Sequence, residues 1–277
     1  MLGPISFVGG GVMGEAIVQG LLAKGLLNAE KITASEPRQE RRDELRKKHG
    51  INVTADNREA ARCCDILVFS VKPQDLGKVL AELKGLLRPE QMVLSIVAGA
   101  RLRTISQGLA HNAIVRVMPN TPAQIGEGIS VWTATPTVNQ NQLDQARTIL
   151  QALGKELYMN DEKFLDMATA VSGTGPTYVF LVMEAIIDAA VHLGFPRHVA
   201  YELVTETMRG SILFAMKSGK HPAELRNMVT SPGGTSAEAL YQLEKGTLRT
   251  VLSKAIWAAY ERTRSLGEGQ DVSERKD

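Results

Sequence analysis

Short apolar runs alternate with amphipathic stretches over residues 1–162. The apolar runs predict strands at 5–9, 31–35, 52–55, 65–71, 91–97 and 114–118. Hydrophobic residues at helical spacing predict helices at 13–24, 40–48, 58–63, 76–87 and 102–109. Strands that alternate with helices of this length form right-handed crossovers, so the pattern predicts an α/β fold with a Rossmann-like, doubly wound parallel sheet. Segments 129–133 and 156–159, with a helix at 141–152 between them, are expected to extend this sheet.

The pattern changes at about residue 163, where strands give way to long helical segments. Helices are predicted at 178–193, 198–217, 222–228, 236–245 and 248–265, with glycine and proline between them. We therefore expect an all-α domain over residues 163–277, with a frayed tail from about residue 266. Segment 178–193 is apolar on nearly every side, so we expect it to be buried in a core or in a subunit interface.

The charge balance and the cysteines narrow the class of protein. Lys and Arg number 32 and Asp and Glu number 30, a net charge of +2 that does not indicate binding to nucleic acid or membranes. The most apolar stretch contains Glu184 and Asp188, so no membrane span is expected. The adjacent Cys63 and Cys64 offer no disulfide framework, and the five histidines show no ligand spacing, so no metal site is expected. No basic segment precedes Ile5, which predicts no signal peptide and a cytoplasmic location.

Gly9, Gly11 and Gly14 form a G-x-G-x-x-G pattern directly after the first predicted strand and at the start of the first predicted helix. Gly9 allows a tight turn, Gly11 lets the backbone approach a pyrophosphate, and Gly14 lets the helix pack closely on the strand. The helix N-terminus offers unpaired N–H groups to phosphates. In this position the pattern predicts a dinucleotide site, and a glycine-rich turn without a ligand is the alternative.

The end of the second predicted strand carries signals for both dinucleotides. An acidic residue there binds the ribose 2′-hydroxyl of NAD, whereas arginine accommodates the 2′-phosphate of NADP. Glu36 favours NADH, and Ser35 and Arg38, with Arg41 and Arg42 nearby, favour NADPH. Glu36 could instead turn away and pair with an arginine. We favour NADPH, with NADH as the alternative.

Three further loops carry polar side chains. Loops 71–74 and 118–122 follow strands whose carboxyl ends face the ligand in a doubly wound sheet, so Lys72 and Asn120 could bind a nicotinamide ribose or amide, or only stabilise turns. In the helical half, Thr235 and Glu238 have capping-box spacing, which predicts the start of a helix. The N–H groups and hydroxyls of this turn could hold a small carboxylate, although spacing alone favours a plain helix cap. Its candidate residues are Ser231, Gly233, Gly234, Thr235 and Ser236.

Over nearly its whole length the chain resembles the Δ1-pyrroline-5-carboxylate reductase family. The resemblance rests on the glycine loop with Met13, on Asn57, on loops 71–74 and 118–122, and on segments 171–178 and 222–240. It implies reduction of 1-pyrroline-5-carboxylate to L-proline, the last step of proline biosynthesis, by hydride transfer from NADPH or NADH to C5 of the imine. It also implies a homodimer formed through the helical domain and, in many members, a decamer of five dimers.

Motif and resemblance together define the expected site. The expected cofactor-binding residues are Gly9, Gly11, Val12, Met13, Gly14, Ser35, Glu36, Arg38, Asn57, Ser70, Val71, Lys72, Pro73, Ala98, Gly99 and Asn120. The resemblance implies that the turn at 231–236 receives the substrate carboxylate. It also implies that a hydroxyl of this turn, Ser236, orients the imine nitrogen, at a position where the family usually has threonine.

The implied chemistry needs few titratable groups. The protonated imine is already an electrophile, so alignment of the two reactants supplies much of the rate enhancement. A β-hydroxyacid-type dehydrogenase is an alternative, but it needs a base, commonly a lysine on the first long helix of the helical domain, and 178–193 contains none. A non-catalytic dinucleotide-binding oligomer is a second alternative, and the intact turn at 231–236 argues against it.

Overall fold

The computed structural model describes residues 2–272, and the side chains of residues 2–267. The chain divides into two compact units. The first contains the chain up to Gly175 together with the chain from Ala258 onward, and the second is Pro176–Trp257. The expected division by function between residues 162 and 163 stays a prediction.

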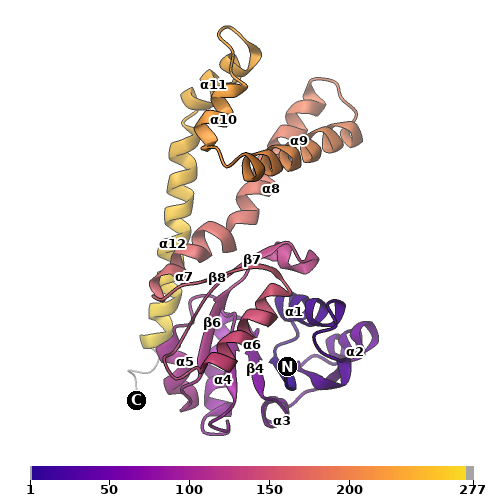
Figure 1. Ribbon diagram of the computed structural model, residues 1–277, viewed down its shortest axis with the longest axis vertical. Helices are drawn as coiled ribbons and strands as arrows, with labels where there is room; N and C mark the ends of the chain where they lie inside the picture. The colour runs from indigo at the N-terminus through magenta and orange to yellow at the C-terminus, as the bar shows by residue number, and fades with distance from the viewer. Residues whose placement is uncertain (1, 273–277) are drawn as a thin grey trace. The chain divides into compact units, whose positions relative to one another are not determined.

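The first unit is built around an eight-stranded sheet (Figure 1). The strand order is β3-β2-β1-β4-β5-β6-β7-β8. The strands are β1 (Ile5–Val8), β2 (Ile32–Ser35), β3 (Asn52–Thr54), β4 (Ile66–Phe69), β5 (Met92–Ser95), β6 (Ile114–Met118), β7 (Gly128–Ala134) and β8 (Gly154–Tyr158). The chain builds outward from β1 to β3 and then returns to place β4 on the other side of β1. This reversal is the switch point of a doubly wound sheet.

Except at Lys163–Ala168, where the sequence pattern predicted no helix, the helices follow the predicted order. The first unit contains α1 (Val12–Ala23), α2 (Gln39–His49), α3 (Asn57–Arg62), α4 (Leu76–Leu83), α5 (Leu102–Leu109), α6 (Gln140–Gln151) and α7 (Lys163–Ala168). The helices α8 (Gly175–His192), α9 (Arg197–Ser218), α10 (Pro222–Met228), α11 (Thr235–Lys245) and α12 (Leu248–Val272) follow. The predicted fold class, a Rossmann-like sheet followed by an all-α region, is confirmed.

The sheet departs from the prediction at one edge. The strands from β3 to β6 are parallel, but β7 pairs antiparallel with β6, and β8 is parallel to β7. Between β6 and β7 the chain forms only the short 3₁₀ turn Thr121–Ile125. A parallel connection needs a crossover of a dozen or more residues, so this short link reverses the strand.

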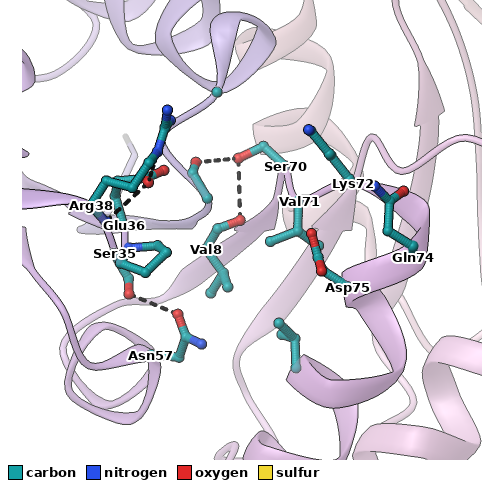
Figure 2. A pocket seen from close by; sticks show the side chains of 14 residues that line it. Val8, Ser35, Glu36, Arg38, Asn57, Ser70, Val71, Lys72, Gln74 and Asp75 are labelled. Atoms are coloured by element: carbon teal, nitrogen blue, oxygen red, sulfur yellow. Dashed lines mark hydrogen bonds and ion pairs between the residues drawn. The ribbon is translucent and has the colours of Figure 1, made fainter. Parts of the chain in front are cut away.

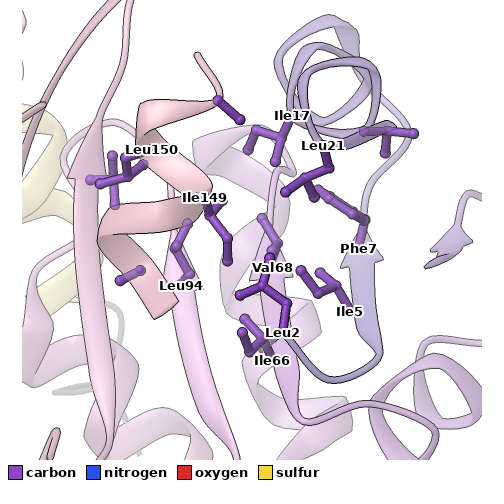
Figure 3. Close-up of a cluster of buried hydrophobic side chains, with 14 of the residues drawn as sticks. Leu2, Ile5, Phe7, Ile17, Leu21, Ile66, Val68, Leu94, Ile149 and Leu150 are labelled. Carbon is purple, nitrogen blue, oxygen red and sulfur yellow. The ribbon is translucent and has the colours of Figure 1, made fainter. Parts of the chain in front are cut away.

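Both faces of the sheet are buried, which explains the continuous apolar runs. Along β4, Ile66 and Val68 pack into one cluster, whereas Leu67 and Phe69 pack into the other. Helices α1 and α6 cover the first face, with Ile17 among the buried side chains (Figure 3). Helices α3, α4 and α5 cover the second face.

Arg116 of β6 connects the sheet to the beginning of the helical region. Its buried guanidinium pairs with Glu162 at 2.8 Å and with Asp166 at 2.6 Å. Glu162 also accepts a hydrogen bond from the N–H of Leu102. These contacts hold α7 against the sheet, so α7 belongs to the first compact unit.

Helix α12 continues to Val272, past residue 266, where the sequence predicted fraying. Residues 273–277 lie outside the described part of the chain. Thr263 and Gly267 are buried. A Cβ placed on Gly99 would lie 3.1 Å from the Cβ of Leu266, so the end of α12 packs against the loop that follows β5. This packing holds the helix as far as Gly267.

The helices of the second unit bury few of their apolar side chains within the chain. Its core cluster contains Ile187, Ala200 and Val204. Phe180 and Leu181 of α8 are 56% and 64% exposed, so this apolar helix is not surrounded by its own chain. By length and composition alone, the stretch Lys163–His192 could cross a membrane: its most apolar 18-residue segment has a mean hydropathy of 1.4. That segment is 11% buried in the chain. The sequence pattern did not predict a stretch that passes this test.

Candidate functional site

A cavity of about 560 Å³ opens at the carboxyl ends of β1, β2 and β4, at the switch point of the sheet (Figure 2). Strand order places these three ends side by side, and loops from distant parts of the sequence meet there. Nine of the expected cofactor-binding residues line the cavity: Gly9, Gly11, Ser35, Glu36, Arg38, Asn57, Ser70, Val71 and Lys72. The structure thus brings together the glycine loop and the ends of β2 and β4.

Two of the three motif glycines are required by the protein itself. Gly9 has a φ of +102°, and a Cβ there would lie 2.8 Å from the carbonyl oxygen of Ser70. A Cβ on Gly14 would lie 2.7 Å from the hydroxyl oxygen of Ser70. That hydroxyl donates a hydrogen bond to the carbonyl of Gly9 at 2.7 Å. The glycine loop and the end of β4 are therefore in direct contact, without room for side chains.

Gly11 differs, because the protein leaves space beside it. Among residues 2–272, a Cβ on Gly11 would meet one atom within 4 Å beyond its chain neighbours, the carbonyl oxygen of Ser70 at 3.7 Å, an ordinary contact distance. Gly11 is also the N-cap of α1 and provides no side-chain cap. An open space beside an uncapped helix N-terminus fits a phosphate group. The residues present therefore fit a dinucleotide.

At the end of β2, the carboxylate of Glu36 faces the protein. Its Oε2 accepts a hydrogen bond from the N–H of Gly10 at 3.1 Å, and its Oε1 accepts from the N–H and the Nε of Arg38 at 3.2 and 2.8 Å. Burial raises the pKa of Glu36, but these hydrogen bonds outweigh it and hold the pKa below its usual value. Of the two orientations that the sequence allowed for Glu36, the structure shows the one paired with an arginine. The carboxylate is buried in this pair and not solvated.

Ser35 and Asn57 form the neighbouring wall of the cavity. The hydroxyl of Ser35 donates to the Oδ1 of Asn57 at 2.7 Å, and the Nδ2 of Asn57 donates to Glu82 at 2.8 Å. Asp56 caps α3 through the N–H of Arg58, which fixes the backbone on both sides of Asn57. Both side chains are thereby held in single orientations at the cavity.

The remaining expected cofactor-binding residues do not line this cavity; they are Val12, Met13, Gly14, Pro73, Ala98, Gly99 and Asn120. The Oδ1 of Asn120 accepts a hydrogen bond from the N–H of Ile129, so this part of its side chain stabilises the start of β7. Gly99 lies against the end of α12.

The prediction did not include five residues that do line the cavity: Val8, Pro37, Gln74, Asp75 and Val79. Gln74 and Asp75 belong to the 3₁₀ turn Pro73–Asp75. Their position directly after Lys72 and Pro73 was a usable signal. Val79 lies in α4, and no local pattern marks it.

The predicted turn of the second unit precedes α11. The helix begins at Thr235, but Gly234 is its N-cap and no side chain caps it, so the capping box expected from Thr235 and Glu238 does not form. The N–H of Gly234 donates to the carbonyl of Ser231 at 3.0 Å and is therefore already used. Within residues 2–272, the N–H groups of Gly233, Thr235 and Ser236 have no hydrogen-bond partner. They are available to an anion.

Comparison with known proteins agrees with both halves of the chain. Residues 162–266 match the family model described as pyrroline-5-carboxylate reductase dimerisation, and residues 4–99 match the model described as NADP oxidoreductase, coenzyme F420-dependent. Pyrroline-5-carboxylate reductase of Synechocystis sp. is 41% identical over 265 residues, which cover 95% of this chain and 98% of the relative. The chain belongs to the pyrroline-5-carboxylate reductase family. The resemblance found in the sequence is confirmed.

Solved structures of this family have the same fold. The pyrroline carboxylate reductase of Plasmodium falciparum, solved with NADP bound, has a TM-score of 0.88 at 34% identity and covers 95% of this chain and 98% of its own. The pyrroline-5-carboxylate reductase of Coxiella burnetii has a TM-score of 0.85 at 36% identity, with 96% and 99% covered. The family fold therefore extends through both units.

Replacing Gly11 with alanine tests the interpretation of the glycine loop. We expect Gly11→Ala to leave the melting temperature nearly unchanged, because the Cβ has room, and to weaken binding of NADPH by about tenfold or more, because the methyl group lies where a phosphate approaches. Calorimetric titration and thermal unfolding measure the two effects.

Gly77→Ala is the matched control, since a Cβ there meets nothing within 4 Å and Gly77 does not line the cavity. Equal NADPH affinity in the Gly11 and Gly77 variants would contradict the assignment.

Proposed function

We propose that this chain reduces 1-pyrroline-5-carboxylate to L-proline with NADPH or NADH as the reductant. The observation that carries the proposal is the 41% identity to a pyrroline-5-carboxylate reductase across 95% of the chain. A cavity lined by the glycine loop in the first unit, and unused N–H groups in the second, agree with it. The NADP bound to the Plasmodium falciparum relative gives the same cofactor class.

The first unit binds the cofactor in this proposal. The backbone at Gly9–Gly14 receives the pyrophosphate, Ser35 and Asn57 lie at the adenosine end, and Lys72 lies toward the nicotinamide ribose. The family resemblance places four further residues near the nicotinamide: Pro73, Ala98, Gly99 and Asn120. Val12 and Met13, in the first turn of α1, also bind the cofactor in this proposal. The reduced nicotinamide, when bound, supplies a hydride.

The turn before α11 binds the substrate carboxylate. The N–H groups of Gly233, Thr235 and Ser236 are unused by the described chain, and Gly233 has a φ of +71°, which is typical of backbone nests that hold anions. The bond from Gly234 to Ser231 closes the turn and fixes its shape. The hydroxyls of Ser231 and Ser236 add donors at the same turn.

The residues of the site act by holding the substrate. The protonated imine is an electrophile, so no general base, nucleophile or metal is needed for reduction at C5. Ser236 hydrogen-bonds the imine nitrogen and thereby fixes the ring relative to the carboxylate site. Restricting the reactants in this way can lower a barrier by about 7–11 kcal/mol in favourable cases.

We also propose a homodimer formed through the helices of the second unit, with a decamer of five dimers as the larger assembly. Phe180, Leu181 and Ile212 are each more than half exposed in the single chain, and the matching family model is named for dimerisation. Such an exposed apolar surface needs a cover. The proposed dimer covers the apolar residues of α8, so the stretch Lys163–His192 needs no membrane to cover it. We propose a cytoplasmic protein without a membrane or nucleic-acid partner.

Steady-state spectrophotometry tests the activity. We expect oxidation of NADPH or NADH at 340 nm on addition of 1-pyrroline-5-carboxylate, and no reduction of NADP⁺ or NAD⁺ by 3-hydroxyacids. The reverse pattern would identify a β-hydroxyacid-type dehydrogenase. Tight cofactor binding without turnover of either substrate class would identify a non-catalytic oligomer.

Ser236→Ala tests the hydroxyl at the imine. We expect kcat/KM for 1-pyrroline-5-carboxylate to fall by about tenfold or more, the usual cost of a lost hydrogen bond in the transition state. Ser106→Ala removes a hydroxyl from α5 in the first unit and is expected to leave kcat/KM unchanged. A Ser236→Ala value within about twofold of the parent would rule out the proposed role.

Leu181→Glu tests the interface. A carboxylate in an apolar interface is costly to desolvate, so we expect light scattering after size exclusion to show a monomer. Ile125→Glu is the control, since Ile125 is 78% exposed but lies in the first unit. An unchanged assembly in the Leu181 variant would place the interface elsewhere.

A further inference from the structure

Glu36 has the sequence position of an NAD-binding acid but not the orientation. An acid at the end of β2 selects NADH by accepting hydrogen bonds from the ribose hydroxyls. Here the carboxylate of Glu36 already accepts three hydrogen bonds, from the N–H of Gly10 and from two groups of Arg38. The residue is only 6% exposed. Most of its acceptor capacity is therefore directed into the protein.

Gly10 is held from both sides by charged side chains. Its N–H donates to Glu36, and its carbonyl accepts from the Nε of Arg41 at 2.8 Å. Arg41 also pairs with Glu15 in the first turn of α1. The peptide groups at the centre of the glycine loop are thus fixed by side chains from the β2–α2 region.

Glu15 completes this network. Lys48 and His49 at the end of α2 lie 2.7 and 2.9 Å from its carboxylate. Burial raises the pKa of Glu15, but the hydrogen bonds from Lys48, Arg41 and His49 outweigh it and hold the pKa at about 2. Glu15 is therefore ionised at neutral pH, and its contacts pair the end of α2 with the start of α1.

Arg38 presents the opposite charge to the cavity. Its side chain is 71% exposed and lines the cavity, and Figure 2 shows the contact with Glu36 at its inner end. That contact uses the Nε. Within the described residues, the two terminal nitrogens of the guanidinium form no hydrogen bond and remain available to an anion.

The geometry points to Glu36 as a positioning residue that sets cofactor choice: its carboxylate binds Gly10 and Arg38 and fixes the Arg38 guanidinium at the cavity, where it would bind a 2′-phosphate. The chain therefore favours NADPH over NADH through the acidic residue that would normally favour NADH. This inference rests on the proposed function only in assuming that the cavity binds a dinucleotide. It adds a role for Glu36 that requires no contact with the cofactor.

Binding measurements on the full-length protein test the inference without turnover. Calorimetric titration gives the dissociation constants of NADPH and NADH, and the ratio of NADH to NADPH is the readout. We expect a ratio of about ten or more in the parent, since two hydrogen bonds to a charged phosphate are at stake. In Glu36→Gln we expect the ratio to fall toward one, because the amide is uncharged and has a single acceptor oxygen. It cannot accept from Arg38 and from the N–H of Gly10 together, so the guanidinium is held less firmly.

The competing role for Glu36 predicts the opposite sign. If Glu36 swings out to bind the ribose, Glu36→Gln weakens NADH selectively and the ratio rises, which would overturn the inference. Equal weakening of both dinucleotides would also overturn it, because the residue would then only support the fold. A parent ratio near one would do the same.

Two further variants complete the experiment. Arg38→Ala changes an exposed side chain and is expected to lower the ratio while leaving the NADH constant within about twofold. Should Glu36→Gln not fold, this variant decides, and an unchanged ratio overturns the inference. Glu40→Gln removes the same charge from an exposed residue of α2 that contacts neither Gly10 nor Arg38, and is expected to leave the ratio unchanged. Absence of turnover with 1-pyrroline-5-carboxylate would refute the proposed function but not this inference.

Discussion

The contact between the glycine loop and Ser70 is the constraint on which the cofactor site depends. Ser70 follows β4, whereas the loop follows β1, and the two strands are neighbours only because the chain reverses at the switch point of the sheet. The approach is so close that neither Gly9 nor Gly14 can carry a side chain. It holds the N-terminus of α1 at the edge of the sheet where β1, β2 and β4 end. The space beside Gly11 is what this packing leaves for a ligand.

Charged side chains also fix the conformation of the glycine loop. Glu36 and Arg41 hold the two peptide groups of Gly10. Because these charges are partly buried and satisfied by hydrogen bonds, they specify one loop shape in advance of binding, which lowers the entropy that a ligand must offset. The same arrangement withdraws a negative charge from the cavity and leaves a positive charge, Arg38, at its rim.

The second unit differs from the first in how little apolar surface it buries. Its helices bury few side chains within the chain, while Phe180 and Leu181 of α8 remain exposed. A second copy of the chain supplies the missing apolar contacts in the proposed dimer. In that proposal, assembly also stabilises the helices that carry the turn before α11, where we place the substrate carboxylate.

Alternation of apolar runs with helical periodicity was enough to predict the order of strands and helices, because these periods are local properties of the chain. The glycine motif likewise predicted the cavity at the switch point, since its spacing encodes a turn and a helix start. Local pattern did not predict the reversal of β7, the packing of the end of α12 against Gly99, or the use of the Gly234 amide within its own turn. The orientation of Glu36 also stayed open in the sequence, which allowed it either to bind the ribose or to turn away and pair with an arginine. Each of these depends on which residues meet after folding: the sequence determined the elements and the chemistry they carry, and contacts between segments far apart in the chain decided the direction of each polar group.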